Sequence, residues 1–354
     1  TVFKTILPAF LREVILRVFT SVGILLVLIK MLDYEGFIAF YLLANLVVVL
    51  IISFYNYKIK AYRFSAISEK VRSEAGTMMK YGMFSMLGGS SFALVQNLDV
   101  IILRILTDEA TVGIYSTFFL IAVVITLPSK ALNTTSYQII ADALKEEDIP
   151  KIGRIYHKTS VVQFLIGCLL LIGLIVNKKS LLFLLHKEEY INHFNIFIIV
   201  GLGFLADITG GLNSAIISFS KHYKMVMGGL MGAAVICGIL NFTLVPLIGM
   251  TGAALSYLLT MLALNFIYWL YIKLKFGLQP FNAKHIYILG VASVGLITGL
   301  LVPQISNFYL DVLVRSTIVT FVYTALAYWL KISPDINEVI EKVLKDARLL
   351  TSRK

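Results

Sequence analysis

Long apolar runs separated by short polar connectors make up most of the chain. Each run holds about 20 residues, the length that crosses the hydrocarbon core of a bilayer as an α-helix. The predicted spans cover residues 11–30, 36–54, 81–104, 113–135, 159–177, 194–219, 225–248, 251–272, 286–303 and 309–330. We therefore expect an all-α, polytopic helical membrane protein with about ten transmembrane helices. Short connectors also predict that consecutive helices pack as neighbours.

The composition excludes a soluble domain as the main part of the chain. Of its 354 residues, 58% are hydrophobic and 14% are charged, whereas soluble domains hold roughly 45–50% apolar and about 25% charged residues. Cys168 and Cys237 both fall in apolar runs, which predicts buried thiols. His186 and His193 share an outer connector but are weak candidates for a metal site. The sequence predicts no metal, no cofactor and no catalytic site.

Basic residues concentrate on alternate connectors. Most of the 31 Lys and Arg residues lie near the two ends and in the connectors that follow even-numbered spans. Because Lys and Arg are enriched on the cytoplasmic side of a membrane protein, we expect both ends of this chain in the cytoplasm. The net charge of +11 then reflects topology and contact with anionic membrane lipids, and nucleic acid is not an expected partner.

Two similar strings occur far apart in the chain. Gly36 and Gly252 each stand five residues before a Tyr-Leu-Leu sequence. The second string lies in "PLIGMTGAALSYLL", whose glycines predict a tight turn between antiparallel helices. Because an even number of spans separates the strings, they indicate a parallel repeat of six-helix units. That pattern is typical of transporters in which two bundles flank a central cavity.

Ionisable residues inside apolar spans are candidate functional residues, because charge in hydrocarbon is costly. The candidates are Arg12, Arg17, Asp99, Lys130 and Asp207. Structural roles stay open for each of them: the basic side chains can extend to lipid headgroups, and Asp99 can accept backbone donors near the interface. Asp207 can form a purely structural pair with Lys130. Pro128 predicts a kink in the span that carries Lys130.

The stretch 97–156 resembles the polysaccharide-transporter branch of the multidrug/oligosaccharidyl-lipid/polysaccharide (MOP) exporter superfamily. The shared features are an Asp before an apolar helix end, the string Val-Gly-Ile-Tyr-Ser, a Pro in the next span and a charged connector ending in Tyr. "VPLIGMTGAALSYLL" is similar to a P-x-x-G-x-x-G-A-A turn of that family. The resemblance extends from residue 5 to about residue 330. It implies a Wzx-type flippase of O-antigen or capsular repeat units in the cytoplasmic membrane of a bacterium or archaeon.

The resemblance also implies an architecture. Such proteins typically form two six-helix lobes, so a two-lobed bundle similar to multidrug-extrusion (MATE) transporters is expected, with one lobe incomplete because the first four helices are absent. The implied parts are a remnant of the N-terminal lobe at 1–80, a C-terminal six-helix lobe at 81–284, two additional transmembrane helices at 285–331 and a cytoplasmic amphipathic tail at 332–354.

A substrate follows from the same resemblance. It is a polyprenyl-diphosphate-linked oligosaccharide, moved by alternating access in the biosynthesis of lipopolysaccharide or another surface polysaccharide, alongside other polysaccharide-assembly proteins. Basic side chains would bind the diphosphate, and amide side chains would bind the sugars. The substrate-binding candidates are Lys130, Arg12, Arg17, Gln96, Asn97, Asn133, Gln138 and Asn213. Asp99 and Asp207 are candidates for coupling a proton or sodium ion to transport.

Two other classes of protein stay open. An ion-coupled multidrug or cation antiporter of the MATE branch would share the fold but favour acidic cavity residues, and the excess of Arg and Lys over Asp disfavours it. A membrane-embedded glycan polymerase or ligase usually carries a large outer loop with catalytic residues. The longest outer segment of this chain, 177–194, is short and mostly apolar. We therefore expect a transporter, not an enzyme.

Overall fold

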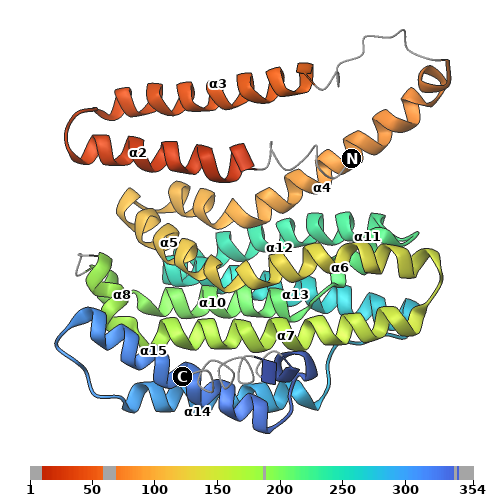
Figure 1. The fold of residues 1–354 in the computed structure, drawn as a ribbon. Helices are drawn as coiled ribbons and strands as arrows, with labels where there is room; N and C mark the ends of the chain where they lie inside the picture. The colour runs from red at the N-terminus through yellow and green to blue at the C-terminus, as the bar shows by residue number, and fades with distance from the viewer. Residues whose placement is uncertain (1–9, 59–68, 186–188, 339–340, 343–354) are drawn as a thin grey trace, which may run out of the picture. The chain divides into compact units, whose positions relative to one another are not determined.

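The computed structural model describes residues 10–58, 69–185, 189–338 and 341–342 (Figure 1). These residues form helices joined by turns, with no β-strand in the described part of the chain, which confirms the predicted all-α class. The chain divides into two compact units, Thr1–Met79 and Lys80–Lys354, called the first and second units below. The tail predicted to be amphipathic lies largely outside the described residues.

The first unit contains a helical hairpin. Its helices are η1 (Leu11–Ile15, a π-helix), α2 (Leu16–Leu28), α3 (Tyr34–Lys58) and the beginning of α4 (Glu69–Leu106). At the start of α3, the Asp33 carboxylate accepts a hydrogen bond of 2.8 Å from the Gly36 backbone N–H. Gly23 allows α2 and α3 to pack closely, because a Cβ there would lie 2.9 Å from Cδ1 of Phe40.

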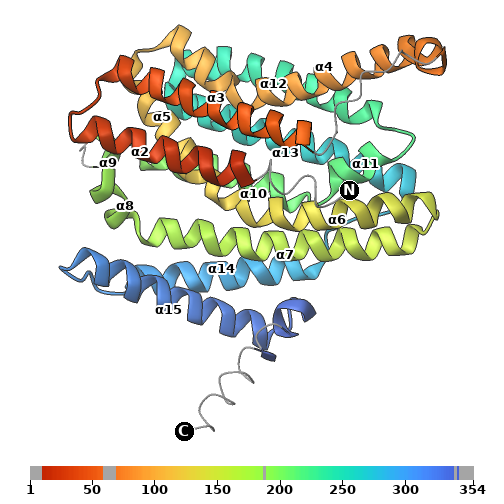
Figure 2. The same cartoon turned by 45° about the horizontal axis from the view of Figure 1, so that its top comes forward.

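In the second unit, helix α7 lies between two groups of helices. Besides the rest of α4, it contains α5 (Glu109–Ala122), η2 (Val123–Thr126, a 3₁₀ helix), α6 (Leu127–Lys145), α7 (Ile149–Val176), α8 (Lys178–Leu185), α9 (Glu189–Asn192), α10 (Phe194–Thr209), α11 (Asn213–Phe219), α12 (Lys224–Ile248), α13 (Met250–Phe276), α14 (Ala283–Leu301) and α15 (Phe308–Trp329). Helices α6 and α10 pack on one side of α7, and α14 and α15 pack on the other (Figure 2). The largest fully buried side chains include Tyr115, Tyr156 and Tyr257.

Among the described residues, seven helical segments are long and apolar enough to cross a membrane, or eight if the bent pair α10–α11 is one span. The sequence predicted ten. Of the other two predicted spans, 11–30 contains α2, which has only 13 residues. The predicted span 81–104 lies in α4, where serines, glycines and the amides of Gln96 and Asn97 lower the mean hydropathy. The structure thus supports a polytopic helical membrane protein with seven or eight candidate spans.

Local sequence explains where two helices of the second unit begin. The 3₁₀ helix η2 ends just before α6, whose second residue is Pro128. Proline has no N–H and disrupts a continuing α-helix, so the predicted distortion takes the form of a 3₁₀ turn. Asp108 caps α5 by accepting a hydrogen bond of 2.8 Å from the Thr111 N–H. The backbone and hydroxyl donors of Thr111 hold the pKa of Asp108 below its ordinary value.

Helices α10 and α11 form one bent element. They meet at an angle of 42° at the Gly210–Gly211 pair. Gly211 has φ +61°, in the left-handed region that favours glycine. A Cβ at Gly211 would lie 3.3 Å from Cα of Ser160 in α7, so a side chain there would press against a backbone. Ser160 Oγ donates a hydrogen bond of 2.7 Å to the carbonyl of Thr209 at the break.

The turn predicted between α12 and α13 is present, with Gly249 at φ +58°. A Cβ at Gly252 would lie 2.4 Å from the carbonyl oxygen of Leu244, and a backbone oxygen cannot move aside as a flexible side chain can. We expect Gly252→Ala to destabilise the protein by about 2 kcal/mol, measured as a lower melting temperature in detergent micelles. Gly238→Ala is the matched control, because a Cβ added there would lie more than 4 Å from every other part of the protein outside its own helical turn. Equal melting temperatures for the two variants would contradict this prediction.

Candidate functional site

A cavity of about 540 Å³ lies within the second unit. Helices α4, α6, α7, α10, α11, α12 and α13 all contribute to its walls. The lining includes residues that the sequence selected as intramembrane polar candidates: Gln96, Lys130, Asn133, Asp207 and Asn213. The structure therefore brings these five residues to one cavity, although they come from four different helices. Their binding roles stay predictions.

The wall formed by α6 and α7 is polar, and only some of its polar atoms have a hydrogen-bond partner. Lys130, one turn after the start of α6, is exposed, and the Gln163 Nε2 group donates a hydrogen bond of 2.6 Å to Asn133 Oδ1. Gln163 Oε1 and Ser129 Oγ are buried and have no hydrogen-bond partner among the described residues. Buried polar atoms normally have a partner, so this wall offers hydrogen bonds to water or to a polar ligand.

A chain of hydrogen bonds runs beside the α10–α11 break and includes three residues of the cavity lining, Asn213, Asn265 and Asp207. Tyr156 donates from its hydroxyl to Asn213 Oδ1. Asn213 Nδ2 donates to Asn265 Oδ1 at 3.2 Å, and Asn265 Nδ2 donates to Asp207 Oδ1, also at 3.2 Å. The sequence left open an ion pair between Asp207 and Lys130. Both side chains line the cavity, but the described residues show no ion pair between them. An amide, not a cation, holds the Asp207 carboxylate.

Asp99 lies outside the cavity lining, in a buried cluster between α4, α5 and α12. Its side chain is 0% exposed. One carboxylate oxygen accepts a hydrogen bond of 2.9 Å from the Tyr115 hydroxyl, and the other accepts from Asn241 Nδ2 at 2.6 Å and from Cys237 Sγ at 3.3 Å. Cys237 is a free, buried thiol, as the sequence predicted, and so is Cys168. Cys237 is also a hydrogen-bond donor, which the sequence did not indicate.

The remaining predicted residues do not line the cavity. Gln138 is exposed and its amide donates to the Asp142 carboxylate at 3.0 Å. Asn97 is exposed, next to Gln96 on α4 but outside the lining. Arg17 lies in α2, and Arg12 lies in η1 with its side chain outside the described part. Both arginines belong to the first unit, so the structure does not relate them to a cavity of the second unit.

Two amides that line the cavity were not selected from the sequence. They are Gln163, buried at 1% exposure, and Asn265. Each lies inside a predicted span, 159–177 or 251–272. An amide within an apolar helix indicates a polar contact inside the protein, because hydrocarbon offers the amide no hydrogen-bond partner. The sequence analysis selected other amides, and the same criterion applied to every amide within a predicted span would have included both.

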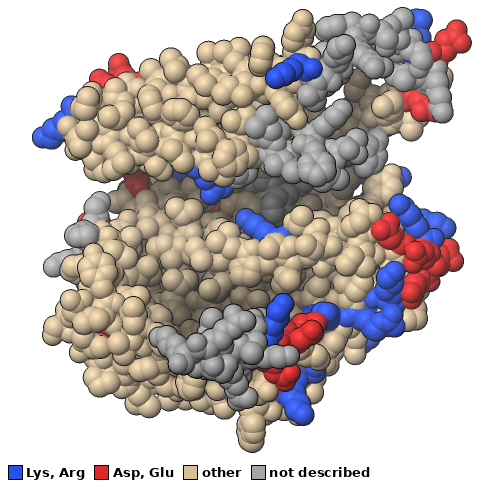
Figure 3. Space-filling view, in the orientation of Figure 1, with Lys and Arg blue, Asp and Glu red and all other residues tan. Residues whose placement is uncertain are grey.

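The surface of the second unit defines the class of protein. Leu120, Leu247 and Phe321 are 72%, 77% and 72% exposed, as expected for helix flanks covered by lipid. Charged side chains gather at the end of the unit where α6 meets α7 (Figure 3), with Lys145 close to Asp142 and Lys151 close to Glu146. Together with the candidate spans, this pattern is that of a multi-pass helical membrane protein.

The chain matches no family model, and no curated protein or solved structure is significantly similar to it. No group of three or more His, Cys, Asp or Glu side chains that could hold a metal ion occurs among the described residues. The observations that bear on function are therefore the membrane spans and the polar cavity that they enclose.

Proposed function

We propose that this protein transports an amphiphilic substrate with a polar, negatively charged headgroup across the cytoplasmic membrane by alternating access. The observation that carries the proposal is the cavity among apolar spans, lined by a lysine and several amides. A headgroup that carries phosphate and sugars would use both kinds of group, the ammonium for charge and the amides for hydroxyls.

The substrate class that fits best is a polyprenyl-diphosphate-linked oligosaccharide, the cargo of the transporters that stretch 97–156 resembles. Lys130 would contact the diphosphate, and Gln163, Asn133 and Asn213 would contact the sugars. The unpaired Gln163 Oε1 and Ser129 Oγ support a polar ligand at this wall. In this proposal the lipid tail stays in the bilayer, both ends of this chain face the cytoplasm, and other polysaccharide-assembly proteins supply and use the cargo.

A coupling ion is part of the proposal. Asp99 and Asp207 are two carboxylates among the packed helices of the second unit, and amide, hydroxyl and thiol donors, not cations, contact them in the described structure. Binding of a proton or sodium ion at one of them would change the charge of a buried group, and transport proteins use such groups as relays. Asp207 is joined to the cavity wall through Asn265, so an ion there would affect the same hydrogen bonds that meet the headgroup.

Flipping can be measured with protein reconstituted in vesicles that contain a fluorescent prenyl-diphosphate oligosaccharide. A membrane-impermeant glycosidase reports the fraction of glycan on each side. We expect Lys130→Ala to lower the flipping rate about tenfold, because one charge-assisted contact to phosphate is lost, and Lys130→Arg to retain most of the rate. Lys145→Ala, an exposed cation at the end of the same helix, is the matched control. Equal rates for Lys130→Ala and Lys145→Ala would remove Lys130 from the site.

A cation or drug antiporter is the second candidate, and one observation favours it. The Asp207 carboxylate lines the same cavity and no cation pairs with it among the described residues. The antiporter predicts that an organic cation is taken up by the vesicles and that Asp207→Asn abolishes this uptake. The flippase predicts no uptake of the cation. Uptake without glycan movement would therefore replace the first proposal with the second.

A further inference from the structure

A second cavity, of about 460 Å³, lies at the opposite end of the second unit from the α6–α7 turn. It is formed where α7 ends and α8 begins, at the start of α10, and where α14 connects to α15. Its polar lining residues are Lys178, Lys179, Gln304, Asp311 and Arg315. Because these positions are the ends of candidate spans, the cavity lies at the level of the lipid headgroups.

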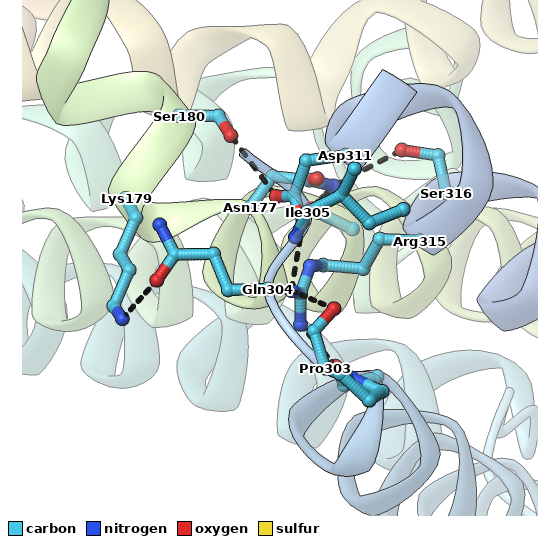
Figure 4. Close-up of polar contacts among 11 residues, drawn as sticks. Asn177, Lys179, Ser180, Pro303, Gln304, Ile305, Asp311, Arg315 and Ser316 are labelled. Carbon is cyan, nitrogen blue, oxygen red and sulfur yellow. Dashed lines mark hydrogen bonds and ion pairs between the residues drawn. The ribbon is translucent and has the colours of Figure 1, made fainter. Parts of the chain in front are cut away.

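The acidic side chain of this cavity is already fully engaged (Figure 4). Asp311 Oδ1 accepts hydrogen bonds from Arg315 at 3.1 Å and from the Ile305 N–H at 3.0 Å, and Oδ2 accepts from Ser180 Oγ at 3.3 Å. Arg315 also donates to the carbonyl oxygen of Gly299 at 2.7 Å. The two opposite charges cancel each other and hold the α14–α15 connection in place.

Two lysine charges remain without a carboxylate in the lining. Lys178 Nζ lies 4.9 Å from the ring centroid of Phe194, a buried residue of the same wall. Lys179 Nζ donates a hydrogen bond of 2.5 Å to Gln304 Oε1, as Figure 4 shows. Both contacts hold an ammonium group at the cavity without neutralising it. Arg315 Nε is a further donor, buried and without an acceptor among the described residues.

We propose that this cavity binds the phosphate group of an anionic phospholipid, with Lys178 and Lys179 as its cations. The lysines supply the charge, and the apolar wall formed by Ile198, Leu300 and Val302 contacts the beginning of the acyl chains. A free phosphate would leave that apolar wall without a partner. In the orientation that the basic residues predict, the bound lipid belongs to the outer leaflet. The site is separate from the cavity around Lys130 and does not depend on its function.

The test measures retained lipid by native mass spectrometry, on full-length protein in micelles that contain phosphatidylglycerol and phosphatidylcholine. We expect the double variant Lys178→Gln, Lys179→Gln to retain about tenfold less phosphatidylglycerol than the unmodified protein. The control is Lys273→Gln, Lys275→Gln. It removes the same charge from the end of α13, and Lys273 also lies over an aromatic ring, that of Trp269. We expect this control to retain the lipid.

The second arm adds inorganic pyrophosphate. Displacement of phosphatidylglycerol would show that the lysines recognise phosphate from either source, and unchanged retention would show that they require the lipid. The melting temperatures of both double variants without added lipid are expected to match, because Lys178 and Lys179 are not buried. Equal retention by the two double variants, or equal retention of phosphatidylcholine and phosphatidylglycerol by the unmodified protein, would overturn the proposal.

Discussion

Asp99→Ala is expected to destabilise the protein by about 3 kcal/mol, because buried donors without an acceptor each cost about 1–3 kcal/mol. The variant leaves the Tyr115 hydroxyl, Asn241 Nδ2 and the Cys237 thiol facing an empty space where the carboxylate was. Bulk solvent does not reach this cluster, since Asp99 is 0% exposed. The loss is measured as a lower melting temperature in detergent micelles.

Two milder variants separate the hydrogen bonds from the charge. Tyr115→Phe removes one donor and is expected to cost about 1 kcal/mol. Asp99→Asn keeps the shape and one acceptor, so we expect it to fold while losing any ion that Asp99 binds. Full stability of Asp99→Ala would show that the cluster contributes nothing. Stable Asp99→Asn with undiminished ion dependence would exclude Asp99 as a coupling residue.

Asp311→Leu is expected to destabilise the protein by about 2 kcal/mol, less than for a fully enclosed ion pair because a cavity opens beside it. The change leaves the Arg315 guanidinium buried without its counter-charge and the Ile305 N–H without an acceptor. The double variant Asp311→Leu, Arg315→Leu is expected to recover part of the loss, since both charges are then removed. Thermal melting of the single and double variants measures both effects.

An exposed ion pair provides the comparison. Arg104 and Glu109 lie 2.7 Å apart, but their side chains are 59% and 80% exposed. Solvent screens such a pair, so Glu109→Leu is expected to change stability by less than about 1 kcal/mol. If Asp311→Leu proved no more harmful than Glu109→Leu, the Asp311–Arg315 pair would not hold the α14–α15 connection.

The sequence predicted most of the helices because a bilayer imposes both their length and their apolarity. Two predicted spans are not among the candidate spans of the described residues, and each meets only one of these conditions: α2 is apolar but has 13 residues, and α4 is long but has a lower mean hydropathy. The α10–α11 break was not predicted, although the Gly210–Gly211 pair was visible. A glycine pair within an apolar run permits either close helix packing or a break. The choice depends on the neighbouring Ser160, which only the fold brings there.

The sequence predicted polar residues of the kinds that line the cavity, but it did not always identify the helix face that points toward the cavity. On α6 the cavity residues Ser129, Lys130, Asn133 and Tyr137 lie on one face of the helix, because Asn133 follows Ser129 by four residues and Lys130 by three, and Tyr137 follows Asn133 by four. Gln138 is off this face, and on α4 Asn97 is about 100° around the helix from Gln96. The sequence analysis selected polar residues without asking which face of the helix they occupy, so it included both Gln138 and Asn97. No feature of the sequence showed that the acceptors of Asp99 would meet donors from α5 and α12.

The Gly210–Gly211 pair bends the element formed by α10 and α11 by 42°, between two residues of the candidate site. Asp207 precedes the glycine pair and Asn213 follows it, and Asn265 of α13 bridges their side chains. Rotation about one or two backbone bonds at Gly211 would swing the short helix while α10 stays packed. Such a swing would stretch or release that bridge. A local change at the carboxylate would thus alter the tilt of a half-span, without any long helix having to bend.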